Sequence, residues 1–452
     1  MYLIYSLLFS IGVVLTAPYY LWRLRGNLIS GAGWAERFGF LPNELQQPDK
    51  GEGSGAVWIH AVSVGETLAV APLIEEFQRH FPGRKIFLSQ VTPAGRKAGE
   101  RRLPGVAGRF YLPLDWRWAV ERVLARIRPE LLLIVETELW PNLLRSAHAS
   151  GARVALINAR LSSRSFKGYR LARPFMRRVL ECVDWVGAQS QTDAGRFELL
   201  GAKPERVSVT GNVKFDGKPP RTSELVGQLE KAIRGANRGP VFVAASTMAG
   251  EETLLLPAWH EIRRQYPQAL FILAPRHPAR FDQVAQLLAR EDRRFARRTE
   301  LGTSDELRSE QFSRNEILLL DTVGELAGVF ALADLVFMGG SLVPTGGHNV
   351  LEPAFWGKAI VFGPHMENFR DVAALFLNGS AAVQVHSASE LGAAACGLLR
   401  DEPRRRRLGE AAKEILARQA GGTERILERL RPWLEKDPAA APAAHLAGSR
   451  AK

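Results

Sequence analysis

Acidic side chains follow two apolar runs in the first half of the chain. Glu66 lies in the segment 63–67, between an apolar run and a predicted helix, and Glu136 and Glu138 follow the apolar run 131–135. A carboxylate that is partly removed from water has a raised pKa and can take a proton from an attacking hydroxyl group. Glu66 is therefore a candidate general base. An acid in the first turn of a helix is also favoured by the helix dipole alone, and this simpler explanation stays open.

A basic residue, Lys214, follows the last apolar run of the same half. It lies between the run 207–210 and the polar, proline-containing stretch 215–223, which resembles a linker. A lysine in this place could neutralise a leaving phosphate or a substrate carboxylate. The alternative is a solvated lysine without a chemical role.

The strongest local pattern of the second half is the glycine-rich segment 339–353. It follows an apolar run and leads into a predicted helix. Glycines let the backbone approach a phosphate, helix amides donate to it, and Glu352 could accept from both hydroxyls of a ribose. Asn349 to Glu352 would then bind the ribose and phosphate of a nucleotide. A tight turn followed by an acid in the first helical turn explains the same residues without a ligand.

Two further segments of the second half end apolar runs. Pro275 and Arg276 close one run, and an arginine there can bind phosphate or carboxylate with two hydrogen bonds. The segment 321–325 closes another, and its main chain together with Glu325 could contact the edge of a base. A capping box between Thr322 and Glu325 is an equally good explanation.

The candidate residues described above follow apolar runs that are predicted to be strands of parallel sheets. From Ala56 onward, apolar runs of strand length alternate with amphipathic segments of helix length, and the pattern restarts after the stretch 215–223. Such alternation predicts two doubly wound α/β domains, in which ligands bind beyond the carboxyl ends of the strands. The predicted division is an N-terminal helix over 1–25, α/β domains over 26–216 and 217–436, and a frayed tail over 437–452.

The N-terminal segment is predicted to be a membrane anchor. Residues 1–22 carry no charged side chain, and a helix of that length, about 33 Å, can cross a bilayer core. The aromatic residues Tyr19, Tyr20 and Trp22, followed by Arg23 and Arg25, predict that the remaining chain faces the cytoplasm. A cleaved signal peptide and a helix that lies in the membrane interface are alternatives.

The chain is strongly basic, with 60 Lys and Arg against 47 Asp and Glu and a net charge of +13. Such an excess indicates an anionic partner, either nucleic acid, a membrane or a phosphorylated substrate. The segment 160–180 contains seven basic residues and no acid, which suits anionic lipid, although it could be a solvated face. Two cysteines exclude a disulfide framework and a cysteine-rich zinc site, and the chain contains no recognised nucleic-acid-binding motif.

Several long motifs occur in an order that closely resembles the 3-deoxy-D-manno-octulosonic acid (Kdo) transferases of lipid A biosynthesis. They are His60–Thr67, Glu136–Asn142, Asn158–Ser162, Gly211–Asp216, Pro275–Pro278 and Gly346–Pro353. The resemblance implies a GT-B glycosyltransferase whose two Rossmann-like domains face a cleft, the first binding the acceptor and the second the CMP-sugar. It implies inverting transfer of Kdo from CMP-Kdo to the lipid A precursor, without a metal or other cofactor, at the cytoplasmic face of the inner membrane.

The resemblance also implies roles for single residues. The general base falls on Glu66, the first acid of the Glu-Thr-Glu motif on Glu136, and the lysine that stabilises the transition state on Lys214. The implied CMP contacts are Pro275, Arg276, Val323, Gly324, Glu325, Asn349, Val350, Leu351 and Glu352. The segment 89–95 departs from the family because it contains fewer threonines.

Two alternatives to a Kdo transferase remain at this point. A GT-B enzyme or epimerase that uses a UDP-sugar would also need a glycine-rich turn and an acid in the first helical turn. A basic protein that binds nucleic acid or membrane without catalysis is more remote, because it would not need acids and a lysine at several strand ends.

Overall fold

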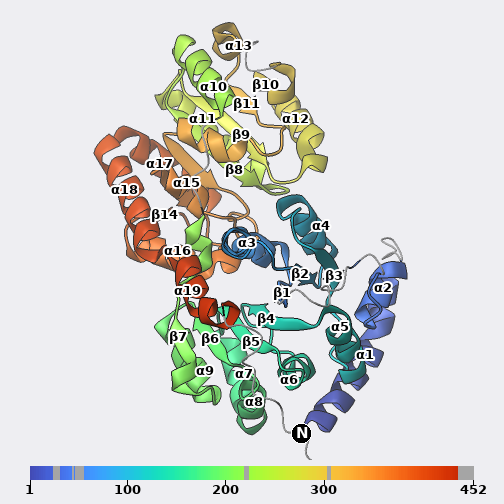
Figure 1. Ribbon diagram of the computed structural model, residues 1–452. Coiled ribbons are helices and arrows are strands. Elements are labelled where there is room, and N and C mark those ends of the chain that lie inside the picture. The colour runs from blue at the N-terminus through green and yellow to red at the C-terminus, as the bar shows by residue number, and fades with distance from the viewer. Residues whose placement is uncertain (24–30, 43–44, 46–54, 218–222, 303–306, 436–452) are drawn as a thin grey trace, which may run out of the picture. The chain divides into compact units, whose positions relative to one another are not determined.

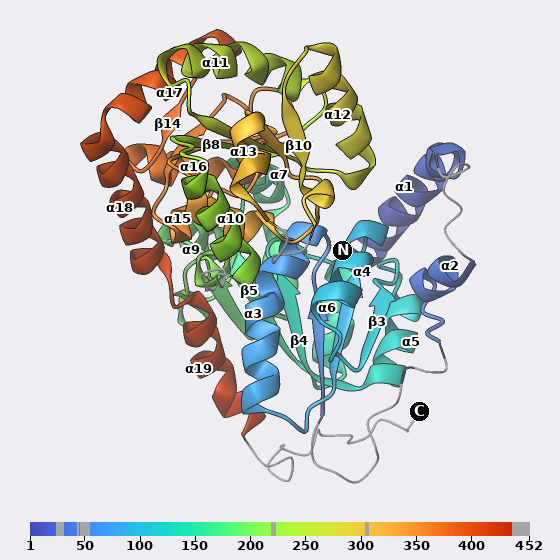
Figure 2. The same cartoon turned by 90° about the horizontal axis from the view of Figure 1, so that it is seen from above.

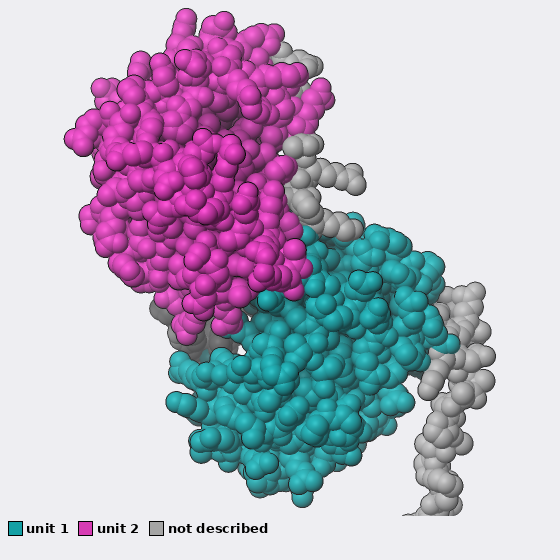
Figure 3. All heavy atoms as spheres, turned by 90° about the vertical axis from the view of Figure 1, so that its left-hand side faces the viewer, with its two compact units in different colours: residues 1–217, 419–452 teal, residues 218–418 magenta. Residues whose placement is uncertain are grey.

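The computed structural model describes residues 1–23, 31–42, 45, 55–217, 223–302 and 307–435. The chain forms two compact units, of which the first comprises residues 1–217 with 419–452 and the second residues 218–418 (Figure 3). Each unit contains one sheet of seven strands flanked by helices (Figure 1). Two α/β units with parallel sheets are therefore confirmed.

The first sheet has the strand order β3-β2-β1-β4-β5-β6-β7, and its pairings are parallel. Its strands are β1 (Ala56–His60), β2 (Ile86–Gln90), β3 (Gly108–Tyr111), β4 (Pro129–Val135), β5 (Arg153–Ala159), β6 (Trp185–Ala188) and β7 (Val207–Val209). The helices of this unit are α1 (Tyr2–Arg23), α2 (Gly31–Arg37), α3 (Val64–His80), α4 (Pro93–Arg102), α5 (Arg117–Ile127), α6 (Pro141–Ala149), α7 (Ser163–Leu171), α8 (Arg173–Leu180), α9 (Gln191–Leu200) and α19 (Gly422–Leu434), with short 3-10 turns η2 (Pro204–Arg206) and η3 (Val213–Asp216). Two apolar cores pack on this sheet.

The second sheet has the order β10-β11-β9-β8-β12-β13-β14, again with parallel pairings. Its strands are β8 (Val241–Thr247), β9 (Leu270–Pro275), β10 (Phe295–Arg297), β11 (Ile317–Leu319), β12 (Leu335–Met338), β13 (Ala359–Phe362) and β14 (Val383–Gln384). The helices are α10 (Glu224–Gly235), α11 (Glu251–Gln265), α12 (Phe281–Arg290), α13 (Ser309–Arg314), α14 (Leu326–Val329), α15 (Leu351–Phe355), α16 (Arg370–Asn378), α17 (Ala388–Arg400) and α18 (Glu402–Gln419), with 3-10 turns η4 (Pro278–Arg280), η5 (Arg298–Glu300), η7 (Phe330–Leu332) and η8 (Glu367–Phe369).

Both sheets reverse their strand order at one place. In the first sheet β1 neighbours both β2 and β4, and in the second β8 neighbours both β9 and β12. Loops leave such a switch point in opposite directions, so the carboxyl ends of these strands leave room for a ligand. The residues that follow β1, β4, β8 and β12 are therefore the first place to look for a site in each unit.

The last helix, α19, belongs to the first unit, whereas the predicted second domain extended to residue 436. It lies along α3 (Figure 2), and Ile426, Leu427 and Leu430 are part of the core on that face of the first sheet. The carboxylate of Asp216 accepts hydrogen bonds from the amides of Gly421 (2.7 Å), Gly422 (3.2 Å) and Thr423, which cap the helix. The predicted tail, 437–452, lies outside the described residues.

The helix α1 is held to the first unit by its polar side chains. Tyr5 donates to Asp115 Oδ2 (2.8 Å), and Ser10 Oγ accepts from Trp116 Nε1 (2.8 Å). Ser6 Oγ accepts from Asn142 Nδ2 at 3.0 Å. These same polar residues dilute the apolar run of the segment.

Within the described part of the chain, no helix combines the length and the apolar character needed to cross a membrane. The prediction of a single membrane-spanning anchor over residues 1–25 was therefore wrong, and so was the localisation that rested on it. The physical reason is the set of tyrosine and serine side chains in the run, which bond to the first unit. Arg25 lies outside the described residues.

The basic segment 160–180 forms two short helices, α7 and α8, rather than one continuous helix. Arg164, Lys167, Arg170 and Arg173 on these helices are exposed. The binding of anionic lipid to this segment stays a prediction.

Candidate functional site

The side chain of Glu66 is held at the start of α3, directly after β1. Its Oε2 accepts from the Val62 amide (2.8 Å) and its Oε1 from the Ser63 hydroxyl (3.0 Å), while Ser63 Oγ caps the helix by accepting from the Glu66 amide. The alternative explanation, an acid in the first turn of a helix, therefore describes the local geometry correctly. It does not account for the charge state, because burial raises the pKa of Glu66 to about 7. The neighbouring carboxylates of Glu136 and Glu138 raise this pKa further, while the Val62 and Ser63 donors oppose the shift.

Glu136 and Lys214 form an ion pair at the same edge of the first sheet. Lys214 Nζ lies 2.9 Å from Glu136 Oε1, and the two side chains are 22% and 19% exposed. Lys214 is thus paired rather than merely solvated. Glu136 itself has a φ of 62°, in the left-handed region that non-glycine residues seldom adopt. Strained residues of this kind cluster at functional sites.

Lys214 is placed by a network at the end of the first unit's sheet. It lies in η3, where its amide donates to Asn212 Oδ1 (3.0 Å) and the preceding Val213 amide donates to Asn158 Oδ1 (3.2 Å). Asn158 also has a positive φ, of 51°. Residues of β5 and residues that follow β1, β4 and β7 therefore form one cluster of acidic and basic side chains.

Glu138 completes this cluster. Burial raises its pKa and the charge of Glu136 raises it further, while the neighbouring Trp140 side chain opposes the shift. The structure thus brings together three of the acids and the lysine that the sequence placed after separate apolar runs. The common edge follows from parallel strands, whose carboxyl ends meet on one side of a sheet.

In the second unit, Arg276 lies within electrostatic reach of the residues that begin α15. Burial raises the pKa of Glu352, while a hydrogen bond from Asn349 and the charge of Arg276 oppose that shift. Asn349 Nδ2 donates to Glu352 Oε1 at 3.3 Å, and Asn349 Oδ1 accepts from the Leu351 amide at 3.1 Å. Val350 and Leu351 are buried beside them. An exposed cation thus stands beside an acid and an amide, a combination that suits a phosphate next to a sugar.

His348 was not predicted as a contact, yet it belongs to the same group. Burial lowers its pKa to about 4, and the charges of Arg276 and His277 add to this effect. Its imidazole is therefore neutral at physiological pH. Among the described residues its Nε2 atom has no hydrogen-bond partner.

Glu325 is held by an arginine, and the alternative explanation for this segment, a capping box between Thr322 and Glu325, does not describe the geometry. Arg298 Nε lies 3.1 Å from Glu325 Oε2. Within the described chain, Thr322 Oγ1 is buried without a hydrogen-bond partner. Glu325 precedes α14, Gly324 has a φ of 97°, and Val323 is 75% exposed. An exposed apolar side chain on a glycine turn is available to a flat ligand such as a base.

Pro275 is the buried last residue of β9, directly before Arg276.

Two acids that follow β8, Glu251 and Glu252, were not singled out from the sequence. The Glu251 carboxylate accepts hydrogen bonds from amides of the glycine-rich loop, the loop that the sequence pattern predicted to bind a phosphate. The only signal was a pair of adjacent acids at a predicted helix start.

No group of three or more His, Cys, Asp or Glu side chains in the described residues is arranged to hold a metal ion. Independence of a metal stays a prediction.

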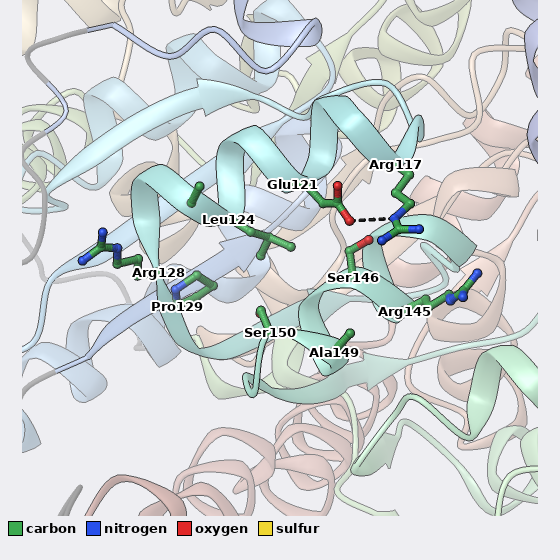
Figure 4. A pocket seen from close by; sticks show the side chains of 10 residues that line it. Arg117, Glu121, Leu124, Arg128, Pro129, Arg145, Ser146, Ala149 and Ser150 are labelled. Carbon is green, nitrogen blue, oxygen red and sulfur yellow. Dashed lines mark hydrogen bonds and ion pairs between the residues drawn. The ribbon is translucent and has the colours of Figure 1, made fainter. Parts of the chain in front are cut away.

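One pocket lies between α5 and α6 of the first unit, away from the residues discussed above. Its volume is about 670 Å³ (Figure 4). Arg117, Arg128 and Arg145 line it, together with Glu121, which pairs with Arg117 at 2.6 Å. None of the predicted site residues lines this pocket.

Comparison with solved structures places the chain in a fold class. A putative UDP-N-acetylglucosamine 2-epimerase from Listeria monocytogenes superposes with a TM-score of 0.54 at 13% identity, covering 85% of this chain and 98% of that one. Two parallel-sheet α/β units with such a neighbour define a GT-B-like fold.

The sequence comparisons define the family. A family model of 3-deoxy-D-manno-octulosonic-acid transferases matches residues 32–217. The Kdo transferase of Haemophilus influenzae is 33% identical over 89% of this chain and 92% of its own length. That of Bordetella pertussis is 35% identical over 92% and 96%, respectively. The chain belongs to the Kdo transferase family of glycosyltransferases, which confirms the resemblance of its motifs.

Proposed function

We propose that this protein transfers Kdo from CMP-Kdo to a lipid A precursor, with inversion at the anomeric carbon. A hydroxyl oxygen of the acceptor bonds to the anomeric carbon of Kdo. The bond from that carbon to the phosphate oxygen breaks, and its electron pair leaves with CMP. The hydroxyl proton passes to the carboxylate of Glu66.

The observation that carries this proposal is the combination of a raised pKa and a carboxylate held in place at Glu66. Its pKa of about 7 makes it a base that is partly deprotonated at neutral pH and can hold the proton that it receives. Val62 and Ser63 direct the carboxylate through two hydrogen bonds. A base with the ordinary pKa of a carboxylate would hold that proton much less well.

Lys214 is proposed to supply positive charge to the reacting centre. Support comes from its ion pair with Glu136, which orders the ammonium group at the same sheet edge as Glu66. A preorganised charge stabilises developing negative charge more than a mobile one does. Glu136 is in this view the residue that positions Lys214.

CMP is proposed to bind the second unit. Arg276 would contact the phosphate, Asn349 and Glu352 the ribose, and the segment 323–325 the cytosine. Support comes from the grouping of Arg276 with Asn349 and Glu352, and from the exposed Val323 beside Gly324. Pro275, Val350 and Leu351 would support these contacts through the main chain.

The variant Glu66→Ala tests the base. We expect unchanged binding of CMP and a fall in transfer rate of about 10²–10⁴-fold, the range of general-base contributions. The rate is measured with CMP-Kdo and a tetra-acylated lipid A precursor. Glu121→Gln, an exposed acid on α5, is the matched control and should keep its activity. Near-normal turnover of Glu66→Ala would contradict the assignment.

A further inference from the structure

The first residue of α11, Glu251, is a fully buried carboxylate whose hydrogen-bonding capacity is filled by backbone amides. Its Oε2 accepts from Gly340 (2.7 Å) and Met248 (3.0 Å), and its Oε1 accepts from Ser341 (3.1 Å) and Leu342 (3.0 Å). Two carboxylate oxygens offer about four acceptor positions, so this group is saturated.

The amides of three successive residues after β12 form an anion-binding concavity, or nest. Gly340 has a φ of 68°, which turns the consecutive N–H groups to one side. The nest lies at the switch point between β8 and β12, where nucleotide phosphates bind in many α/β folds. In this protein the carboxylate of Glu251 occupies the nest, so a ligand phosphate must use other donors.

The loop held by Glu251 leads directly to the proposed ribose contacts. The carbonyl of Gly340 accepts from Thr345 Oγ1 (2.9 Å) and from the Gly347 amide (2.8 Å). Asn349 and Glu352 follow within five residues. These hydrogen bonds link the backbone position of Gly340 to the backbone positions of Asn349 and Glu352.

Glu252, the next residue, anchors the segment that follows β9. It pairs with Arg280 through two parallel hydrogen bonds of 2.8 and 2.7 Å and accepts from Thr247 Oγ1 at 2.7 Å. The Thr247 carbonyl in turn accepts from the Arg276 amide at 3.0 Å. Glu252 is 2% exposed. Glu252 thus holds the Arg280 end of this turn directly, and it contacts Thr247, whose carbonyl holds the Arg276 end.

We propose that Glu251 and Glu252 are positioning residues of the nucleotide site. Two adjacent acids at the start of α11 fix the glycine-rich loop and the Arg276 turn before any ligand binds. The inference rests on the proposed function for the identity of the nucleotide, CMP. Neither acid is a contact of the nucleotide itself.

The variants Glu251→Gln and Glu252→Gln test this inference by calorimetric titration of the full chain with CMP and with cytidine. A glutamine at 251 offers one acceptor oxygen and leaves buried amides unpaired, so the loop should lose its fixed position. We expect about tenfold weaker binding of both CMP and cytidine, the equivalent of one lost buried hydrogen bond. For Glu252→Gln we expect weaker binding of CMP with little change for cytidine, because Arg276 contacts the phosphate.

Asp334→Asn is the matched control, because Asp334 Oδ2 accepts from the Val241 amide (2.7 Å) at the amino end of β8. It should lower Tm without weakening CMP binding. Variants of Glu251 and Glu252 that lower Tm but bind CMP like the wild type would overturn the inference and leave the proposed function intact. If Glu251→Gln does not fold, Glu252→Gln decides alone. A wild-type protein that does not bind CMP would contradict the proposed function first.

Discussion

The pKa of Glu66 is set by two opposing groups of interactions. Burial and two neighbouring carboxylates raise its pKa, while the Val62 amide and the Ser63 hydroxyl lower it. The balance gives a group that titrates near neutral pH. The same residue therefore serves as a helix-start anion and as a base, and the two explanations offered by the sequence are compatible.

Removing one hydrogen-bond donor should move this balance in a known direction. In Ser63→Ala the carboxylate loses the 3.0 Å hydrogen bond that favours its charged form, so the pKa of Glu66 rises. Because the deprotonated form is the base, the acid limb of the pH profile of kcat/KM should move to higher pH. We expect a shift of about half a unit to one unit. A limb that stays in place, or moves to lower pH, would contradict the role of Glu66.

The raised pKa also has a consequence for stability. The folded state holds the proton of Glu66 up to about pH 7, whereas a carboxyl in the unfolded chain loses it near its model value of 4.5. The folded state thus binds more protons in this window, and the contribution of Glu66 to stability falls as pH rises from 4.5 to 7. Glu66→Gln removes this effect. Its Tm relative to the wild type should therefore be higher at pH 8 than at pH 5, as measured by calorimetry, and a pH-independent difference would contradict this prediction.

At the level of elements, continuous apolar runs predicted most of the strands, and the strands that lack such a run were not predicted. The runs 131–135 and 241–244 are strands β4 and β8, because buried parallel strands are apolar on both faces. The short strands β3, β10 and β14 were missed. Buried and half-buried residues alternate in β3, and the residues of β10 and β14 are half-buried, so none of these strands forms a continuous apolar run.

The same reasoning explains which site residues could be predicted. Glu66, Glu136 and Lys214 follow apolar runs, and a parallel sheet brings such positions to one edge. Glu251 bonds to amides about 90 residues away, and no local pattern announces that pairing. The apolar character of the N-terminal segment also led to the wrong prediction of a membrane anchor. Hydrophobicity does not distinguish a serine that faces lipid from one, such as Ser6, that bonds to Asn142.

The capped helix α19 gives a prediction at this scale. Asp216→Ala removes the carboxylate that accepts from three amides at the start of α19, and loss of a cap costs about 1–2 kcal/mol. We expect faster hydrogen exchange over residues 421–430 and a lower Tm. Asp401→Ala, which removes an exposed cap from α18, is the control and should leave exchange in α19 unchanged. Unchanged exchange over 421–430 in Asp216→Ala would contradict the capping role.

For the whole molecule, the fold and the family answer different questions. The fold is shared with a putative UDP-N-acetylglucosamine 2-epimerase at 13% identity, and so does not select a nucleotide. The Kdo transferase relatives, at 33% and 35% identity over nearly the whole chain, do define the family. The net charge of +13 is consistent with a phosphorylated substrate.

The proposed use of CMP-Kdo implies a nucleotide preference that can be measured directly. In calorimetric titrations of the full chain, CMP should bind at least tenfold more tightly than UDP, equivalent to about 1.4 kcal/mol. Arg276→Ala should weaken the binding of CMP, which has a phosphate, more than the binding of cytidine, which has none. Tighter binding of UDP would instead favour a UDP-sugar enzyme.

The activity that we propose is the transfer of Kdo to a lipid acceptor. The most direct measurement is to incubate the purified protein with CMP-Kdo and a tetra-acylated lipid A precursor and to weigh the lipid product by mass spectrometry. We expect a product heavier by one or more Kdo units, with release of CMP, and loss of that product in Glu66→Ala. A wild-type protein that binds CMP yet leaves the mass of the acceptor unchanged would contradict this proposal.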